Sequence, residues 1–244
     1  MIYFISDVHL GILEREKDIF REELLLDFFA KISTDCETLF IVGDLFDYWF
    51  EYKTVIPKYF YRTLSALAEL KAKGIHVEFL MGNHDFGHLN FFETELGISI
   101  YNDDISRELY GKKFYLSHGD GKSYNDTGYK ILKKVTRNPL AQWLYRKLHP
   151  DCGIPIASHS SRKSRDLSDS KIYGPQSGME DFAKIKIDDG YDYVIMGHMH
   201  KPLEKAFGNG KFFVLGAWFN NPTFGMFDGE SMQLLNVKEF LNKT

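Results

Sequence analysis

Cysteine is scarce in this chain of 244 residues, which has only Cys36 and Cys152. Two cysteines cannot build a disulfide framework, nor a metal centre made of several thiolates. Because nine histidines outnumber them, any metal site rests on imidazole and carboxylate ligands. This use of cysteine is typical of a protein from a reducing compartment.

Long apolar runs are missing as well. None reaches the roughly 20 residues of a membrane-spanning helix, and the first residues, Met1 to Asp7, carry an acid instead of the basic start of a signal peptide. We therefore expect a cytoplasmic protein. Hydrophobic residues make up 44% and aromatic residues 16% of the chain, enough for the core of one domain spanning residues 1–244.

Basic charge is not in excess, since the formal net charge is -4, and this argues against a nucleic acid partner. The exception is residues 122–172, with 11 Lys and Arg against 4 Asp and Glu. We interpret this segment as an inserted basic helical lid, with Asn138 and Pro139 starting a helix and a polar loop at 158–171. Its mixed basic and apolar pattern is typical of helices on an anionic membrane surface, but equally of helices that pack on a core.

The apolar pattern predicts an α/β fold, a β-sandwich flanked by helices in α/β/β/α layers. Helical periodicity separates the first three predicted strands, which indicates a parallel sheet. Turn sequences near residues 110–112, 208–210 and 224–237 indicate hairpins in the second half of the chain, and two halves that each contribute sheet indicate a β-sandwich. Strands are expected at 2–5, 38–42, 75–80, 114–116, 191–196 and 212–215, and helices at 17–32, where Phe20, Leu24, Phe28 and Ile32 share a buried face, and at 58–73, before a Gly74 cap.

Polar side chains follow five of these strands, in "FISDVHLG", "FIVGDLFDYWF", "FLMGNHDF", "FYLSHGDG" and "VIMGHMHKP". In α/β sheets ligands bind beyond the carboxyl ends of the strands, so the clusters should converge on one crevice. One such Asp or His is usually a cap or a turn former, but five clusters together indicate a metal site. The candidate ligands are Asp7, His9, Asp44, Asn83, His118, His198 and His200.

This set is too large for one ion. Two divalent ions that share a carboxylate could use it, and such a pair is a common apparatus for displacement at phosphorus. A glycine adjoins the candidates in "GD", "GN", "HGD" and "GH", as expected where the backbone turns sharply toward an ion. Oxygen and imidazole ligands admit Mn, Fe, Zn or Co. The bulky neighbours Phe46, Trp49 and Phe50 are expected in the core.

The ordered motifs resemble those of the calcineurin-like metallophosphoesterases over residues 5–202. The resemblance implies a β-sandwich flanked by helices, with two ions bridged by Asp44. One ion would be held by Asp7, His9, Asp44 and His200, and the other by Asp44, Asn83, His118 and His198. It also implies that His84 lies near the leaving oxygen as a proton donor, with Asp85 as its orienting partner.

A narrower resemblance, to the UDP-2,3-diacylglucosamine hydrolases of lipid A biosynthesis, rests on "SDVHLG", "GDLFDYWF", "HGDG", "NDTGY", "GHMHKP" and "LGAW". It implies cleavage of the pyrophosphate of a nucleotide-linked lipid to UMP and diacylglucosamine 1-phosphate, with manganese as the favoured metal. The insertion would bind acyl chains at the cytoplasmic face of the inner membrane. The substrate contacts implied are Asn83, His84, Asp126, Tyr129, Ser164, Arg165, Lys171 and His198.

Two other functions remain open. The best-known branch of these hydrolases has arginine where this chain has His84, and a histidine also suits a phosphodiesterase or phosphatase acting on a soluble nucleotide or another phosphoester. A metal-free scaffold on the same fold is the other class, and the complete set of candidate ligands argues against it. The pattern does not indicate an oligomeric state.

Overall fold

The computed structural model describes residues 1–12, 15–122, 124, 133–169, 178–219 and 221–243 of the chain. Its strands are β1 (Ile2–Ile5), β2 (Thr38–Val42), β3 (His76–Leu80), β4 (Ser99–Tyr101), β5 (Ile105–Leu109), β6 (Lys112–Ser117), β7 (Tyr193–Met196), β8 (Leu203–Phe207), β9 (Gly210–Val214), β10 (Thr223–Phe227) and β11 (Met232–Asn236). Its helices are α1 (Arg15–Ile32), α2 (Tyr61–Ala72), α3 (Phe91–Thr94), α5 (Pro139–Tyr145), α6 (Pro150–Asp169), α7 (Gly178–Asp188) and α8 (Val237–Asn242), with a 3₁₀ turn η1 (Lys58–Phe60).

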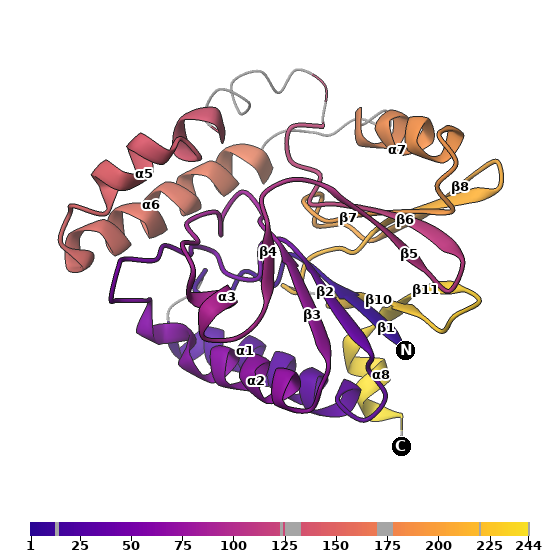
Figure 1. Ribbon diagram of the computed structural model, residues 1–244, viewed down its shortest axis with the longest axis horizontal. Coiled ribbons are helices and arrows are strands. Elements are labelled where there is room, and N and C mark those ends of the chain that lie inside the picture. Colours follow the sequence, from indigo (N-terminus) through magenta and orange to yellow (C-terminus); the bar gives the residue numbers. More distant parts are fainter. Residues whose placement is uncertain (13–14, 123, 125–132, 170–177, 220, 244) are drawn as a thin grey trace.

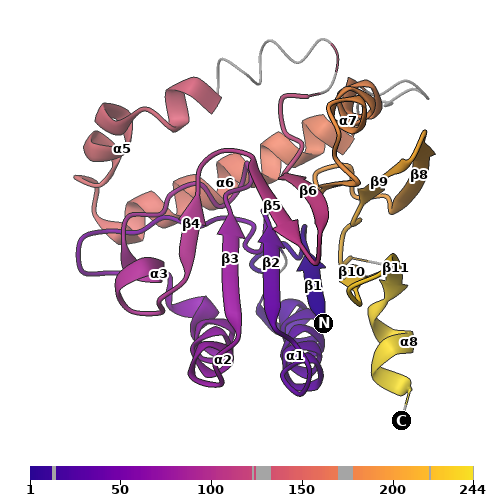
Figure 2. The ribbon, with the colours of Figure 1, turned by 45° about the vertical axis from the view of Figure 1, so that its right-hand side comes forward.

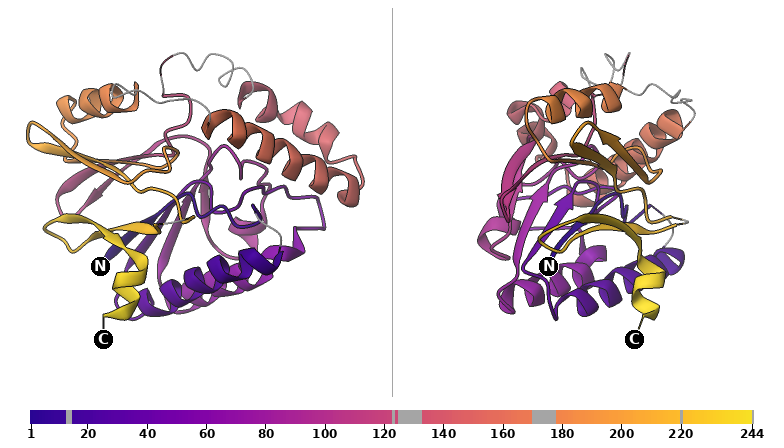
Figure 3. Two further views of the ribbon diagram at one scale, coloured as in Figure 1. Left: turned by 180° about the vertical axis from the view of Figure 1, so that it is seen from behind. Right: turned by 90° about the vertical axis from the view of Figure 1, so that its right-hand side faces the viewer.

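These strands form two facing sheets, which confirms the predicted sandwich (Figure 1). One sheet has the order β11-β10-β1-β2-β3-β4 and the other β5-β6-β7-β9-β8. Within them β1, β2, β3 and β4 run parallel, as do β6, β7 and β9. Helices α1, α2 and α8 cover the outer face of the first sheet and α7 that of the second, as the views in Figure 3 show.

The core between the sheets is aromatic. Phe4 stacks on Phe40 with ring centroids 5.1 Å apart and on Phe114, from the opposite sheet, at 5.7 Å. All three rings are fully buried. Strands β1 and β2 lie between a helical layer and this aromatic layer, so both faces are buried and their sequences are continuous apolar runs.

Helix α1 corrects one prediction, because Phe20 is 75% exposed. Its buried face instead follows Glu22, Leu25, Phe29 and Ile32. A stripe taken strictly every fourth residue rotates by roughly 40° per step around a helix of 3.6 residues per turn. The predicted stripe is therefore buried at its end and leaves the core at Phe20.

Helices α5 and α6 lie beyond the carboxyl ends of β1, β2 and β3 (Figure 2). Asn138 caps α5 and accepts hydrogen bonds from the amides of Leu140 and Ala141, and Pro139 takes the first helical position, as predicted. The polar loop expected at 158–171 was wrong over residues 158–169, which continue α6. Beyond Pro155 this stretch has no further proline or glycine to end a solvated helix.

The described helices give no candidate for a membrane span, because none is both long and apolar enough. Whether residues 122–172 form a lid inserted in a single domain stays a prediction, since residues 123, 125–132 and 170–172 lie outside the described part.

Candidate active site

The structure brings the seven candidate metal ligands together where five strands end. Loops after β1, β2 and β3 contribute from the first sheet, and loops after β6 and β7 from the second. The parallel registers place these ends side by side. By strand, the residues are Asp7 and His9 after β1, Asp44 after β2, Asn83 after β3, His118 after β6, and His198 and His200 after β7.

Five of these seven residues have a left-handed backbone conformation. The φ angles are 52° at Asp7, 51° at His9, 55° at Asp44, 68° at His198 and 45° at His200. Such angles are uncommon outside glycine and cluster at functional sites. The left-handed turn thus falls on the candidate ligand itself, and this is how Asp7 and His9, two residues apart, both face the site.

The glycines beside the candidate ligands either let a ligand side chain pack close to the backbone or allow the backbone to turn. A Cβ added to Gly82 would lie 2.0 Å from Asp44 Oδ1, and one added to Gly197 would lie 2.5 Å from Asp7 Oδ2. Neither glycine has a positive φ, whereas Gly43 does, at 83°. The expectation of a sharp turn therefore holds at Gly43, and lack of a side chain is what matters at Gly82 and Gly197.

Asp44 lies at the centre of the cluster. Its Oδ1 accepts the backbone amide of His84 at 2.9 Å. Its Oδ2 is buried without a hydrogen-bond donor and lies 3.7 Å from His9 Nε2 and 3.2 Å from His118 Nε2. One carboxylate oxygen therefore faces imidazoles from both sheets, the position that a bridging ligand requires.

The Nε2 atom of His118 faces two oxygen atoms that, like itself, carry lone pairs. Nδ1 of His118 lies 2.9 Å from the carbonyl of Val42, which can only accept, so Nδ1 carries the hydrogen. Nε2 then faces Asp44 Oδ2 and, at 3.0 Å, Asn83 Oδ1. Burial disfavours a charged ring, yet the Asp44 carboxylate raises the pKa of His118 to about 10. Positive charge, from a proton or a cation, is therefore stabilised between these atoms.

In a second group, formed by Asp7, His9 and His200, atoms with lone pairs also lie close together. Nε2 of His9 and Nε2 of His200 are 3.2 Å apart, and both lie within 3.7 Å of Asp7 Oδ1. Burial opposes charge on His9 as well, but contacts with Asp47 and Asp7 raise its pKa to about 9. Three sets of side chains have ligand atoms within 4.8 Å of one another: Asp7, His9 and His200; His9, Asp44 and His84; and Asp7, Asp44 and His118. This set of nitrogen and oxygen donors fits divalent metal ions.

The contacts of the Asp85 carboxylate are with backbone amides, while its expected role beside His84 stays a prediction. The carboxylate accepts the backbone amides of Asp44, Leu45 and Gly82, so it joins the loops after β2 and β3. Burial and the Asp44 carboxylate raise the pKa of Asp85 to about 6.

Asp47 contacts the imidazole of His84. Its carbonyl lies 3.2 Å and its Oδ1 3.8 Å from His84 Nδ1, and the same Oδ1 lies 3.3 Å from His9 Nδ1. Asp47 is fully buried, and sequence reasoning missed it. The one signal available was a second acid three residues after Asp44, in "GDLFD".

The expected substrate contacts are only partly placed. Asn83 and His198 adjoin each other, with Asn83 Oδ1 2.9 Å from His198 Nδ1, and burial lowers the pKa of His198 to about 4. Asp126, Tyr129 and Lys171 lie outside the described residues, as do the side chains of Ser164 and Arg165, whose backbone belongs to α6.

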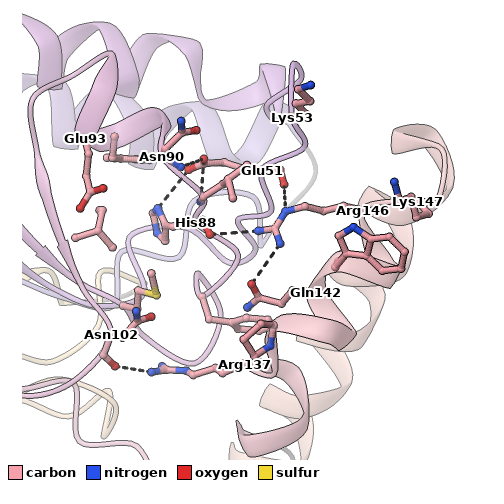
Figure 4. Close-up of a pocket in the computed structure, with 17 residues that line it drawn as sticks. Glu51, Lys53, His88, Asn90, Glu93, Asn102, Arg137, Gln142, Arg146 and Lys147 are labelled. Carbon is pink, nitrogen blue, oxygen red and sulfur yellow. Dashed lines mark hydrogen bonds and ion pairs between the residues drawn. The ribbon is translucent and has the colours of Figure 1, made fainter.

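A cavity of about 740 Å³ lies beside the loop that carries Asn83 and His84 (Figure 4). Its wall includes Met81 and Phe86, the residues on either side of the "GNHD" sequence, and Trp143 from α5. Arg146 closes part of the wall by donating to the carbonyls of Glu51 and His88. The rest of the lining is mixed, comprising Lys53, Leu89, Asn90, Phe92, Glu93, Ile100, Asn102, Arg137, Pro139, Gln142 and Lys147.

Comparisons with known proteins show the family of this chain. The calcineurin-like phosphoesterase model matches residues 1–202. A UDP-2,3-diacylglucosamine hydrolase of Porphyromonas gingivalis is 32% identical over 98% of each chain. Namesakes from Edwardsiella ictaluri and Hahella chejuensis are 29% and 28% identical over 96% of this chain and 91% and 96% of their own. An archaeal phosphodiesterase structure aligns over 96% of this chain and 98% of its own, with 15% identity and a TM-score of 0.46. The chain belongs to the calcineurin-like phosphoesterase family.

Proposed function

We propose that this protein hydrolyses the pyrophosphate of UDP-2,3-diacylglucosamine to UMP and 2,3-diacylglucosamine 1-phosphate in lipid A biosynthesis. The observation that carries the proposal is the cluster of candidate ligands around Asp44, beside a cavity whose mixed lining includes Met81, Phe86 and Trp143. The relatives that bear the name of this hydrolase support it, because they match nearly the whole chain.

Two divalent ions, with manganese as the proposed metal, complete the site. Asp7, His9, Asp44 and His200 would hold one ion, and Asp44, Asn83, His118 and His198 the other. When bound, the two ions activate water as a nucleophile and neutralise charge on the phosphoryl oxygens. The buried Asp44 Oδ2, which has no hydrogen-bond donor, supports this assignment.

His84 is proposed to serve the leaving oxygen. Because its Nδ1 faces the carbonyl of Asp47, Nδ1 carries a hydrogen, and Nε2 is the nitrogen proposed to serve the substrate. His84 can then give up a proton from Nε2 only as an imidazolium. Oδ1 of Asp47 lies 3.8 Å from the same Nδ1. Asp85 contributes by holding the loop after β3 against the loop after β2.

The cavity supports a substrate with a lipid part. Met81 and Phe86 place apolar surface next to Asn83 and His84, so a chain bound there would lie within reach of the chemistry. Phe92, Ile100 and Trp143 extend this apolar wall. Asp126, Tyr129, Ser164, Arg165 and Lys171 remain proposed contacts of the sugar and phosphates.

Helix α5 is proposed to rest on the cytoplasmic face of the inner membrane. Leu140, Trp143 and Leu144 are each more than half exposed. Lys147 lies over the Trp143 ring at 4.8 Å from its centroid, which pairs a cation with an amphipathic aromatic group. Such a face suits the boundary of an anionic membrane. Sedimentation with anionic vesicles, but not with neutral ones, would support it, and loss of binding in Trp143→Ala would locate it.

The decisive experiment uses protein reconstituted with Mn²⁺ and UDP-2,3-diacylglucosamine in detergent micelles. We expect release of UMP, with none from Asp44→Ala. If UMP is absent while an aryl phosphodiester is turned over, the two-metal site stands and the substrate is a soluble phosphoester instead. If neither substrate is cleaved and Mn²⁺ does not bind, the hydrolase proposal fails.

A further inference from the structure

Two basic side chains from one helical turn reach the loops that carry Asn83 and His118. Residues 133–136 are helical, and the amide of Arg137 bonds to the carbonyl of Lys133. Lys133 Nζ lies 2.6 Å from Oδ2 of the buried Asp120, two residues after His118. Arg137 donates to the carbonyl of Gly82 at 2.9 Å, just before Asn83. We call Lys133 and Arg137 together the basic clasp.

Gly82 is held on three sides. Its amide donates to Asp85 Oδ1 at 2.8 Å, and its Cα faces Asp44 so closely that a Cβ would lie 2.0 Å from Oδ1. Its carbonyl is bound by Arg137, whose other guanidinium nitrogen donates to the carbonyl of Asn102 at 2.6 Å, as Figure 4 shows. Arg137 thus supplies a contact from the helical segment beyond the two sheets.

This contact bears on Asn83 directly. The carbonyl of Gly82 and the amide of Asn83 belong to one planar peptide unit, so fixing the first orients the second. Oδ1 of Asn83 lies 2.9 Å from His198 Nδ1 and 3.0 Å from His118 Nε2. An amide oxygen between two imidazole nitrogens has little freedom to shift without losing one of them.

We propose that the basic clasp positions Asn83 and His118, so that docking of the helical segment and metal affinity on that side of the site are coupled. Arg137 is the principal positioning residue. This inference rests on the proposed two-metal site, but not on the identity of the phosphoester.

The test is Mn²⁺ binding to the metal-free protein by calorimetry. We expect Arg137→Gln to raise the Kd of the ion held by Asn83 and His118 about 10-fold, as is common when a group that supports a ligand is lost. The ion held by Asp7, His9 and His200 should keep its Kd within about 2-fold, an internal control. Arg137→Lys keeps one donor, so its Kd for the ion held by Asn83 and His118 should lie between those of the parent and Arg137→Gln. Lys134→Gln removes the same charge from an exposed neighbour and should change neither Kd.

Catalysis gives a second readout, with bis(4-nitrophenyl) phosphate at saturating Mn²⁺. Arg137→Ala should lower kcat about 10-fold with little change in KM, since small displacements at a site cost catalysis more than binding. Added guanidinium should restore part of the loss. Equal weakening of both ions, unchanged binding in Arg137→Gln, or the same effect in Lys134→Gln would overturn the proposal. If the diester is not cleaved at all, the Kd values decide.

Discussion

Left-handed backbone at Asp7, His9, Asp44, His198 and His200 is the residue-scale signature of the site. This conformation costs an L-residue roughly 1 kcal/mol, so it persists only where surrounding bonds impose it. The amide of Asp7 donates to the carbonyl of Gly43 and that of His9 to the carbonyl of Asp44. The loops are therefore held in place by their own hydrogen bonds.

Replacing Asp47 by asparagine should test whether Asp47 orients the imidazoles of His9 and His84. The amide group can donate toward Nδ1 of His9 and His84 and so favour the wrong tautomer. We expect kcat to fall roughly 10- to 100-fold and Mn²⁺ affinity to drop, measured by diester turnover and calorimetry. The exposed Asp103→Asn is the matched control. Wild-type kcat and affinity in Asp47→Asn would show that Asp47 only fills space.

Gly197→Ala should weaken the ion held by Asp7, His9 and His200. The added Cβ would lie 2.5 Å from Asp7 Oδ2 and 2.9 Å from Ser6 Cβ, so the Asp7 carboxylate must move. We expect the affinity of the ion held by Asp7, His9 and His200 to fall by at least about 10-fold. Calorimetry measures this, and an unchanged far-ultraviolet circular dichroism spectrum would exclude unfolding. Unaltered binding of both ions would refute the assignment of Asp7.

At the scale of elements, polar contacts anchor the short α3 and its loop beside the cavity. Glu51 Oε2 accepts the amides of Leu89, Asn90 and Phe91 at the start of the helix, and Oε1 accepts the indole of Trp49. Glu51 also lies 3.6 Å from the buried His88. Burial opposes ionisation, but His88 and these amides lower the pKa of Glu51 to about 2.

This shift predicts an acid-dependent loss of stability. Because the folded pKa lies below the unfolded one, Glu51 stabilises the fold above about pH 4.5, and the contribution disappears as pH falls toward 2. The shift corresponds to about 3 kcal/mol at neutral pH. Urea unfolding from pH 7 to 3 should show the difference between the parent and Glu51→Gln shrinking with pH. A constant difference would mean that Glu51 acts through neutral hydrogen bonds alone.

Strands and helices were predictable from the sequence wherever apolar residues mark one or both of their faces as buried. Strands β1 and β2 are buried on both sides, so their apolar runs were sufficient, and the Asn138-Pro139 start of α5 follows local capping chemistry. The continuation of α6 to Asp169 was missed because a polar helix and a polar loop share their composition. Likewise, Phe20 was misplaced because a four-residue period only approximates the helix.

At the scale of the whole molecule, the two sheets come together at the site, and each sheet supplies different candidate ligands. Asp7, His9, Asp44 and Asn83 follow strands of the first sheet, and His118, His198 and His200 follow strands of the second. This division was predictable from motifs at strand ends. The partners Asp47 and Arg137 were not, because their contacts join residues 37 to 55 positions apart.

Bound ions should therefore bridge the two sheets and stabilise the fold as a whole. At a free Mn²⁺ concentration about 100 times Kd, binding contributes about 2.7 kcal/mol. For a chain of this size that corresponds to a rise of roughly 5 to 10 °C in Tm. Thermal unfolding with Mn²⁺ and with chelator measures the shift. Asp44→Ala should lose it, and an equal shift in that variant would place the stabilising ions elsewhere.

The left-handed residues also set a limit for protein engineering. A redesign that scores substitutions only by the stability of the metal-free fold would favour glycine at Asp7, His9, Asp44, His198 and His200, since glycine adopts these φ angles without strain. Each such gain would delete a candidate ligand. Thermostable variants of this enzyme should be selected with these five positions held constant, because here foldability and chemistry make opposite demands on the same residues.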